Sequence, residues 1–120
     1  MSEFVEYLKE VFERFGPVQP KRMFGGHGLF HDGLMFGLVA ADTLYLKADD
    51  ATATHFQDRG LPRFEYEKAG RKVKLSYYLA PEDIFDDPEE AAIWARRAFE
   101  AALRADRKPA RKRKLRTRST

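Results

Sequence analysis

The chain has 120 residues, 43% of them apolar and 13% aromatic, which is enough for one hydrophobic core and therefore one domain. It has no cysteine for disulfides or thiolate chemistry. Its longest uncharged run, residues 33–41, is too short to span a bilayer, and its acidic start is unlike a signal peptide, so we expect a cytoplasmic protein with no membrane partner. The net charge of +3 is unevenly distributed: residues 107–120 hold eight of the 22 basic residues and none of the 19 acidic ones, which leaves residues 1–106 at −5.

The first half of the chain predicts a helix followed by a run of short strands. Ser2 is placed to cap a helix that Gly16 and Pro17 end, and apolar residues recur along it at helical spacing. These apolar residues are Phe4, Leu8, Val11, Phe12 and Phe15. Extended segments follow at 22–24, 28–31, 34–40 and 43–48. The turn signals H-D-G-L and A-A-D-T between them predict an antiparallel meander.

The segment 34–40 is apolar on both alternating sets of side chains. Strict alternation puts Leu34, Phe36 and Leu38 on one face. Met35 and Val39 then occupy the other face. We therefore predict a central strand that is covered on both sides.

The second half predicts a short helix, a hairpin and a long helix. Asp49 or Asp50 caps the short helix, which runs to about residue 58 before Gly60 and Pro62. Segments 64–67 and 72–79 form a hairpin through K-A-G-R, and D-D-P-E-E begins a helix that runs to about residue 104. The fold class is therefore α+β: a two-layer structure with an antiparallel sheet of about five strands, a meander plus a hairpin, and helices at the amino terminus, the middle and the carboxy terminus.

The glycine-dense segment 21–35 does not predict an enzyme or a cofactor site. Its glycines do not match a dinucleotide fingerprint, and a strand rather than a helix follows them, so we interpret them as backbone requirements of turns and close contacts. His27 and His31 are about 13 Å apart in an extended chain, too far to share a metal ion. The three serines lie outside any nucleophile motif, and the paired aspartates fit helix caps. We predict no catalytic residue, no metal and no cofactor.

Two basic regions predict contact with nucleic acid. If Tyr45 and Lys47 share a sheet face with the set Lys72, Lys74, Ser76 and Tyr78, a basic surface with aromatic rings results. A solvated sheet face and a dimer interface are the alternatives. Beyond the folded domain, residues 1–105, we expect residues 106–120 to be a disordered basic tail that binds nucleic acid or only aids solubility. Its cations are Arg107, Lys108, Arg111, Lys112, Arg113, Lys114, Arg116 and Arg118.

The chain resembles the amino-terminal domain of the TfoX (Sxy) family of competence regulators over roughly residues 3–103. The likeness lies in R-M-F-G-G at 22–26, G-L-F-x-D-G-x-M-F at 28–36, L-Y-L-K-A-D at 44–49, F-x-Y at 64–66, S-Y-Y at 76–78 and D-D-P-E at 86–89. The resemblance implies a secretion-chaperone-like α+β fold. It also implies a regulator without enzymatic activity, in a family whose competence members act with the cyclic AMP receptor protein at promoters.

From this resemblance we expect a protein partner, with the transcription machinery as one candidate, and a homodimer as a further expectation. The family segments R-M-F-G-G and S-Y-Y mark either a contact surface or the way the sheet is built. The candidate contact residues are Arg22, Phe24, Gly25, Gly26, Lys47 and Tyr78. The alternative function is a small-molecule-binding protein or enzyme with a pocket near Arg22, His27, Tyr77 and Tyr78.

Overall fold

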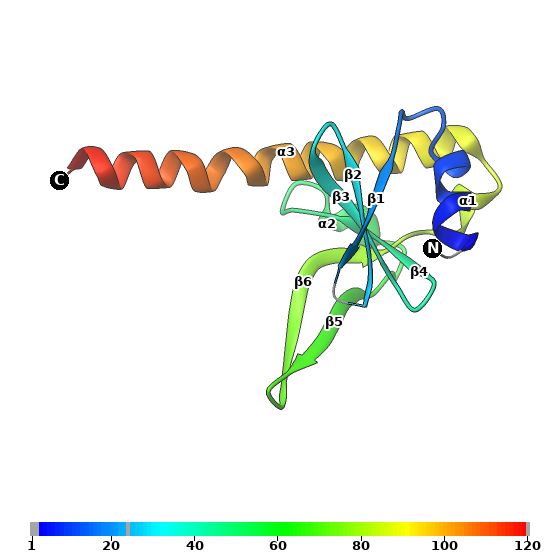
Figure 1. Ribbon diagram of the computed structural model, residues 1–120, viewed down its shortest axis with the longest axis horizontal. Coiled ribbons are helices and arrows are strands. Elements are labelled where there is room, and N and C mark those ends of the chain that lie inside the picture. Colours follow the sequence, from blue (N-terminus) through cyan, green and yellow to red (C-terminus); the bar gives the residue numbers. More distant parts are fainter. Residues whose placement is uncertain (1–2, 24, 120) are drawn as a thin grey trace.

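The computed structural model describes residues 3–23 and 25–119, with side chains through residue 107 (Figure 1). The elements in chain order are α1 (Glu3–Val11), β1 (Gln19–Met23), β2 (Gly26–His31), β3 (Leu34–Ala40), β4 (Thr43–Lys47), α2 (Ala53–Gln57), β5 (Arg63–Lys68), β6 (Arg71–Leu79), the 3-10 helix η1 (Glu82–Phe85) and α3 (Pro88–Ser119). This order confirms the predicted α+β fold class, with helices at both ends and in the middle.

The strands form a single antiparallel sheet in the order β1-β2-β3-β4-β6-β5. In the described part of the chain the sheet has six strands, where about five were expected. The turns follow the predicted chemistry, because Asp32 and Gly33 both have positive φ, 49° and 80°, as a two-residue hairpin turn requires. β1 begins earlier than predicted and includes Pro20, which an edge strand tolerates because its outer N–H groups need no partner.

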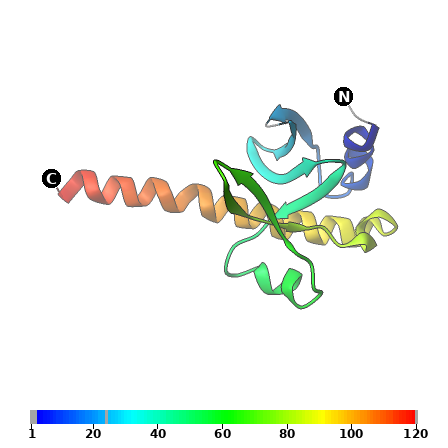
Figure 2. The ribbon, with the colours of Figure 1, turned by 90° about the horizontal axis from the view of Figure 1, so that it is seen from below.

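The α-helices α1, α2 and α3 pack on one face of the sheet. One core cluster contains Leu8 of α1, Phe56 of α2 and Trp94 of α3 together with Leu29 and Leu46 of the sheet. Figures 1 and 2 show α3 crossing this face, with α1 beside its first turns and the β5–β6 hairpin projecting away from the helices. We call the covered side the helix face and the other side the open face, because no helix among the described residues packs on it.

A β-bulge in β3 decides which side chains reach the open face. Leu29 pairs with Gly37 and Phe30 with Met35, so Phe36 is an extra residue on β3. Phe36 therefore lies on the helix face, where its ring is 5.7 Å from that of Phe12. The side chain of Leu38, two residues later, lies on the open face instead. The predicted alternation, with Phe36 and Leu38 on one face, is wrong because the bulge shifts the phase of the strand.

The β4–β6 register also corrects one prediction. Tyr45 pairs with Leu79 and Lys47 with Tyr77, while Tyr78 pairs with the buried Leu46. Tyr45 and Lys47 therefore lie on the opposite side of the sheet from Tyr78 and the lysines that alternate with it. The basic aromatic surface considered for nucleic acid does not form in this arrangement.

The long carboxy-terminal helix begins as the sequence predicts. Asp87 Oδ1 accepts hydrogen bonds from the backbone N–H groups of Glu89 and Glu90, and Pro88 occupies the first helical position. The helix continues past Arg104, where its end was predicted, to Ser119. The side chains of residues 108–120 lie outside the described part, so the prediction of a disordered tail stays a prediction. No helix within the described residues combines the length and apolar character needed to cross a membrane.

Candidate protein-binding groove

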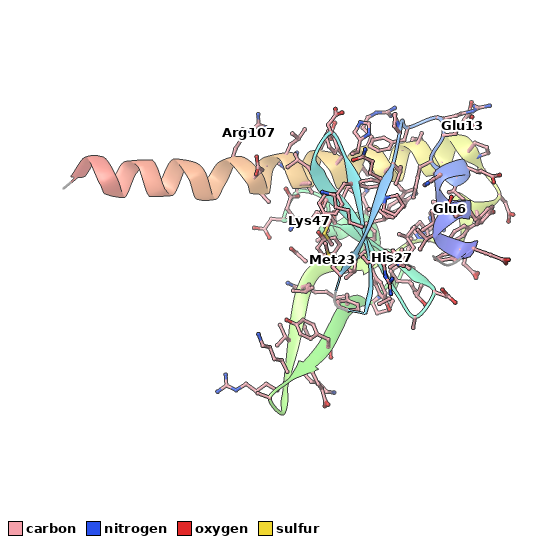
Figure 3. All side chains as sticks on the ribbon, in the orientation of Figure 1. Glu6, Glu13, Met23, His27, Lys47 and Arg107 are labelled. Atoms are coloured by element: carbon pink, nitrogen blue, oxygen red, sulfur yellow. The ribbon has the colours of Figure 1, made fainter. Side chains whose placement is uncertain are left out.

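The open face carries an apolar groove of about 610 Å³. Both ends of the sheet contribute to it, because the tip of the β1–β2 hairpin and the β5–β6 hairpin line the same hollow. Its lining residues are Met23, Gly26, Leu38, Val39, Ala40, Phe64, Tyr66, Lys68 and Leu75. Figure 3 shows Met23 above the base of the projecting β5–β6 hairpin. A hollow of this size, with mostly apolar walls and an open mouth, can receive several side chains of a ligand.

A row of aromatic rings forms the wall of the groove on the β5 side. The ring of Phe64 lies 4.8 Å from that of Tyr45 and 6.1 Å from that of Tyr66. Tyr66 is 39% exposed, among the highest values for a large apolar side chain in the described residues. Methionine and aromatic side chains are enriched where proteins bind one another.

The β5–β6 register separates the charges of the hairpin. Lys68 pairs with Arg71 next to Tyr66 and Val73, on the groove side, whereas Glu65 and Glu67 pair with lysines on the other side. The nearest of those contacts is 3.8 Å, between Lys74 Nζ and Glu65 Oε2. The groove side of the hairpin therefore carries cations and no carboxylate.

The glycines of R-M-F-G-G are explained by the backbone. A Cβ on Gly26 would overlap the carbonyl oxygen of Val39, so only glycine allows β2 to lie this close to β3. Gly25 has a φ of +77° with open space around it, so its requirement is conformational. These observations support the interpretation that the segment is structural. Phe24, a predicted contact residue, lies outside the described residues.

Arg22 and His27 lie opposite each other on β1 and β2 and line a separate hollow of about 290 Å³ with Met23, Gly25 and Gly26. His27 Nε2 is buried without a hydrogen-bond partner among the described residues. His31 has a structural role, because its ring packs between Phe15 and Phe99 and its Nδ1 donates to the Pro17 carbonyl oxygen at 2.7 Å. No group of three potential metal ligands occurs among the described residues.

Lys47 and Tyr77 lie at another hollow, of about 390 Å³, which residues of α3 also line. Lys47 Nζ donates to Ser76 Oγ at 3.1 Å and lies 5.2 Å from the centre of the Tyr77 ring. Burial lowers the pKa of Lys47, and the negative charge of Asp49 offsets part of this by raising it. Burial also raises the pKa of Tyr77 to about 12.

The four residues of the alternative pocket are therefore not brought together. Arg22 and His27 lie on the first two strands of the sheet, and Tyr77 lies on the far side of β3 and β4. Tyr78 is a core residue, because its ring stacks on Phe56 at 5.1 Å and its hydroxyl accepts a hydrogen bond from Gln57 Nε2. Tyr78 is only 8% exposed, which leaves it little surface for the expected contact with a partner.

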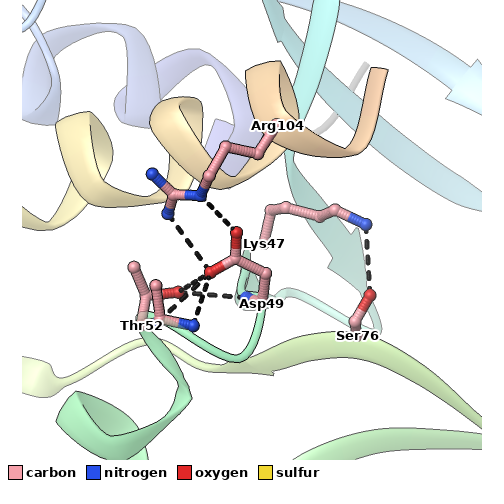
Figure 4. Close-up of polar contacts among 6 residues, drawn as sticks. Lys47, Asp49, Thr52, Ser76 and Arg104 are labelled. Carbon is pink, nitrogen blue, oxygen red and sulfur yellow. Dashed lines mark hydrogen bonds and ion pairs between the residues drawn. The ribbon is translucent and has the colours of Figure 1, made fainter. Parts of the chain in front are cut away.

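A polar network beside Lys47 fixes α3 to the loop after β4 (Figure 4). Arg104 donates to both carboxylate oxygens of Asp49, at 2.6 and 3.2 Å. Asp49 also accepts from the backbone N–H groups of Ala51 and Thr52. The hydrogen bond from Arg104 is the main cause that lowers the pKa of Asp49. Asp49 thus anchors α3 to the turn before α2. The N-cap of α2 is Thr52, so the predicted cap at Asp49 or Asp50 is wrong.

Of the predicted nucleic-acid contacts, only Arg107 has a described side chain, and it is exposed. The predicted contact residues Arg22, Gly25 and Gly26 do lie beside the groove or the adjoining hollow. The groove residues Leu38, Phe64 and Tyr66 were not predicted as contact residues from the sequence. The available signal was the alternation of aromatic and charged residues in 63–68, which indicates an edge strand with one apolar side.

Comparison with known proteins gives consistent results. The sequence model of the family described as TfoX N-terminal domain matches residues 10–102. The chain is 26% identical to Protein Sxy of Escherichia coli (strain K12) over 96 residues, 80% of this chain and 46% of that protein. It is 30% identical to DNA transformation protein TfoX1 of Aliivibrio fischeri (strain ATCC 700601 / ES114) over 78 residues, 65% of this chain and 37% of that protein. The chain thus spans less than half the length of these relatives.

Proposed function

Because the chain belongs to the TfoX N-terminal domain family, we propose that it is a cytoplasmic regulatory domain without enzymatic activity, which acts by binding another protein in the groove of its open face. The observation that carries this proposal is the apolar groove of about 610 Å³ with its exposed aromatic wall. An apolar hollow of this kind on a sheet face without a covering helix favours a binding partner. One relative, TfoX1 of Aliivibrio fischeri, is a DNA transformation protein, which supports a regulatory role for this chain in the same process.

Site-specific cross-linking tests the role of the groove. A photoreactive phenylalanine derivative replaces Tyr66 in the full chain, expressed in its host cell. The matched control replaces Tyr7, which is 42% exposed against 39% for Tyr66 but lies on α1. We expect cross-linked protein adducts from position 66 and not from position 7, and we expect them to survive nuclease treatment. Equal adduct formation at both positions would refute a groove-specific partner.

We further propose that the basic segment 106–120 contacts nucleic acid. Within it, residues 107–120 hold eight cations and no acid, and these cations would release counterions from phosphates, which gives affinity with little sequence preference that falls steeply with salt. Titration of duplex DNA with the full chain and with a chain truncated after residue 105, at two salt concentrations, measures this contribution. Equally weak binding by both chains would reject it.

A further inference from the structure

The chemistry of the groove indicates what kind of segment it binds. We infer that the groove receives an extended segment of a partner protein, in which bulky apolar side chains alternate with acidic ones, and that this segment pairs with the free edge of β5. The inference rests on the proposed function and adds the class of partner. Three independent features of the described residues carry it: the edge strand, the lining and the distribution of charge.

β5 is the last strand of the sheet, and within the described residues it pairs only with β6. Half of the backbone N–H and C=O groups of an edge strand point away from the sheet and are free to pair with another chain. Strand addition uses these groups for affinity and uses pockets for alternate side chains for specificity. Phe64 and Tyr66, two residues apart on β5, line the groove, so an added strand would place its own alternate side chains over the same hollow.

The lining of the groove explains why alternate side chains of the bound segment would be apolar. Met23, Leu38 and Leu75 form the walls and floor, and Leu38 is only 7% exposed although no described helix covers it. Bulky apolar side chains of a bound segment would cover this surface and gain about 25 cal/mol for each Å² removed from water.

The distribution of charge on the hairpin explains why the bound segment would also carry acidic side chains. Lys68 and Arg71 are exposed and directly opposite each other beside the turn, and neither forms an ion pair with a described residue. Like charges in directly opposite positions destabilise a hairpin. A carboxylate bound between them would remove that repulsion, whereas the groove side of a second copy's hairpin offers cations and no carboxylate. The charges therefore favour an acidic partner over self-association through β5.

In the test, the full chain selects peptides from a random displayed library. Peptides that also bind the Tyr66→Asp variant are removed by counter-selection. We expect the selected peptides to alternate apolar and acidic residues, and their binding to slow hydrogen exchange of the amides in residues 63–68. Lys68→Glu should weaken the chosen peptide by about tenfold, while Lys72→Glu, the same charge change on the other side of the hairpin, should alter affinity less than about twofold. Lys68→Glu should not lower the melting temperature, because Glu at this position faces Arg71, so weaker binding cannot be attributed to unfolding.

The outcomes separate this inference from the proposed function. If position 66 cross-links a protein but the selected peptides lack acidic residues, or if Lys68→Glu and Lys72→Glu weaken binding equally, the partner chemistry is wrong and the proposed function stands. If position 66 captures nothing and no peptide is enriched, both are refuted. If decanoate, but no peptide, raises the melting temperature of the wild type and not of Tyr66→Asp, the groove is a site for small amphipathic acids and the inference is overturned.

Discussion

The two adjacent glycines of R-M-F-G-G should respond to alanine for different physical reasons and by different amounts. At Gly26 the added Cβ would overlap the backbone oxygen of Val39, and backbone cannot rotate away as a side chain can. Relief requires β2 to move from β3 next to the His27–Val39 pair. Overpacking costs about 1–3 kcal/mol and a lost ladder hydrogen bond about 1 kcal/mol, so Gly26→Ala should destabilise the domain by about 2–4 kcal/mol.

Gly25→Ala should be milder. The new Cβ meets no atom within 4 Å, and the cost comes from a φ of +77°. The left-handed region costs a non-glycine residue about 1–2 kcal/mol, which the lower entropy of the unfolded chain offsets by about 0.4–1 kcal/mol. The net loss is therefore about 1 kcal/mol. Gly25→Asn should lose less than Gly25→Ala, because asparagine tolerates this region better.

Urea unfolding followed by circular dichroism measures both losses, provided that the slope of the transition stays constant among the variants. Near-equal losses for Gly25→Ala and Gly26→Ala, or a loss at Gly26 below about 0.5 kcal/mol, would refute the steric explanation of the segment. An equal loss for Gly25→Asn and Gly25→Ala would refute the conformational explanation at that position alone.

Three further predictions concern a turn and two ionisable groups. Ala41 has a φ of 51° in the turn between β3 and β4, so Ala41→Gly should stabilise the domain by up to about 1 kcal/mol in the same urea assay; a loss of stability would contradict this. Because Arg104 lowers the pKa of Asp49, the stabilisation by Asp49 is present above the unfolded-state pKa near 4 and is lost as the pH falls through the folded value. Asp49→Asn should therefore be less stable than wild type at pH 7, with the difference shrinking below about pH 4; a pH-independent difference would contradict the ion pair. Burial raises the pKa of Tyr77 to about 12, so stability should fall as the pH rises above the unfolded value near 10, and Tyr77→Phe should remove the highest tyrosine step from an ultraviolet titration; an unchanged titration would contradict this assignment.

Local signals in the sequence were sufficient for the elements but not for the surface. The Asp32–Gly33 turn and the Asp87 cap depend on neighbouring residues alone, and both occur where the pattern predicts them. The bulge at Phe36 could not be predicted, because 34–40 is apolar on both sets of side chains and gives no period to reveal a shift. Without the bulge, Leu38 would be assigned to the wrong face.

The groove was unpredictable for a related reason. It requires that Met23 near the start of the sheet and Tyr66 at its other edge line one hollow, which depends on the curvature of all six strands. Met23 and Gly26 of R-M-F-G-G line the hollow, but their relation to F-x-Y is a tertiary property that no local pattern reveals. The charge split between residues 1–106 and 107–120, in contrast, is independent of the fold and could be read directly.

The two proposed contacts with anions should be energetically independent. The groove offers local cations on a body whose residues 1–106 carry a net charge of −5, whereas the eight cations of 107–120 belong to a separate part of the chain. Lys68→Glu should therefore weaken the selected peptide without changing DNA affinity more than Lys72→Glu does. Truncation after residue 105 should weaken DNA binding without changing the affinity for the peptide. A truncated chain that also carries Lys68→Glu should show both losses, each equal to that of the single variant within about 0.5 kcal/mol, as is usual for distant sites. A truncated chain that loses the acidic peptide would instead show that the basic segment forms part of the groove.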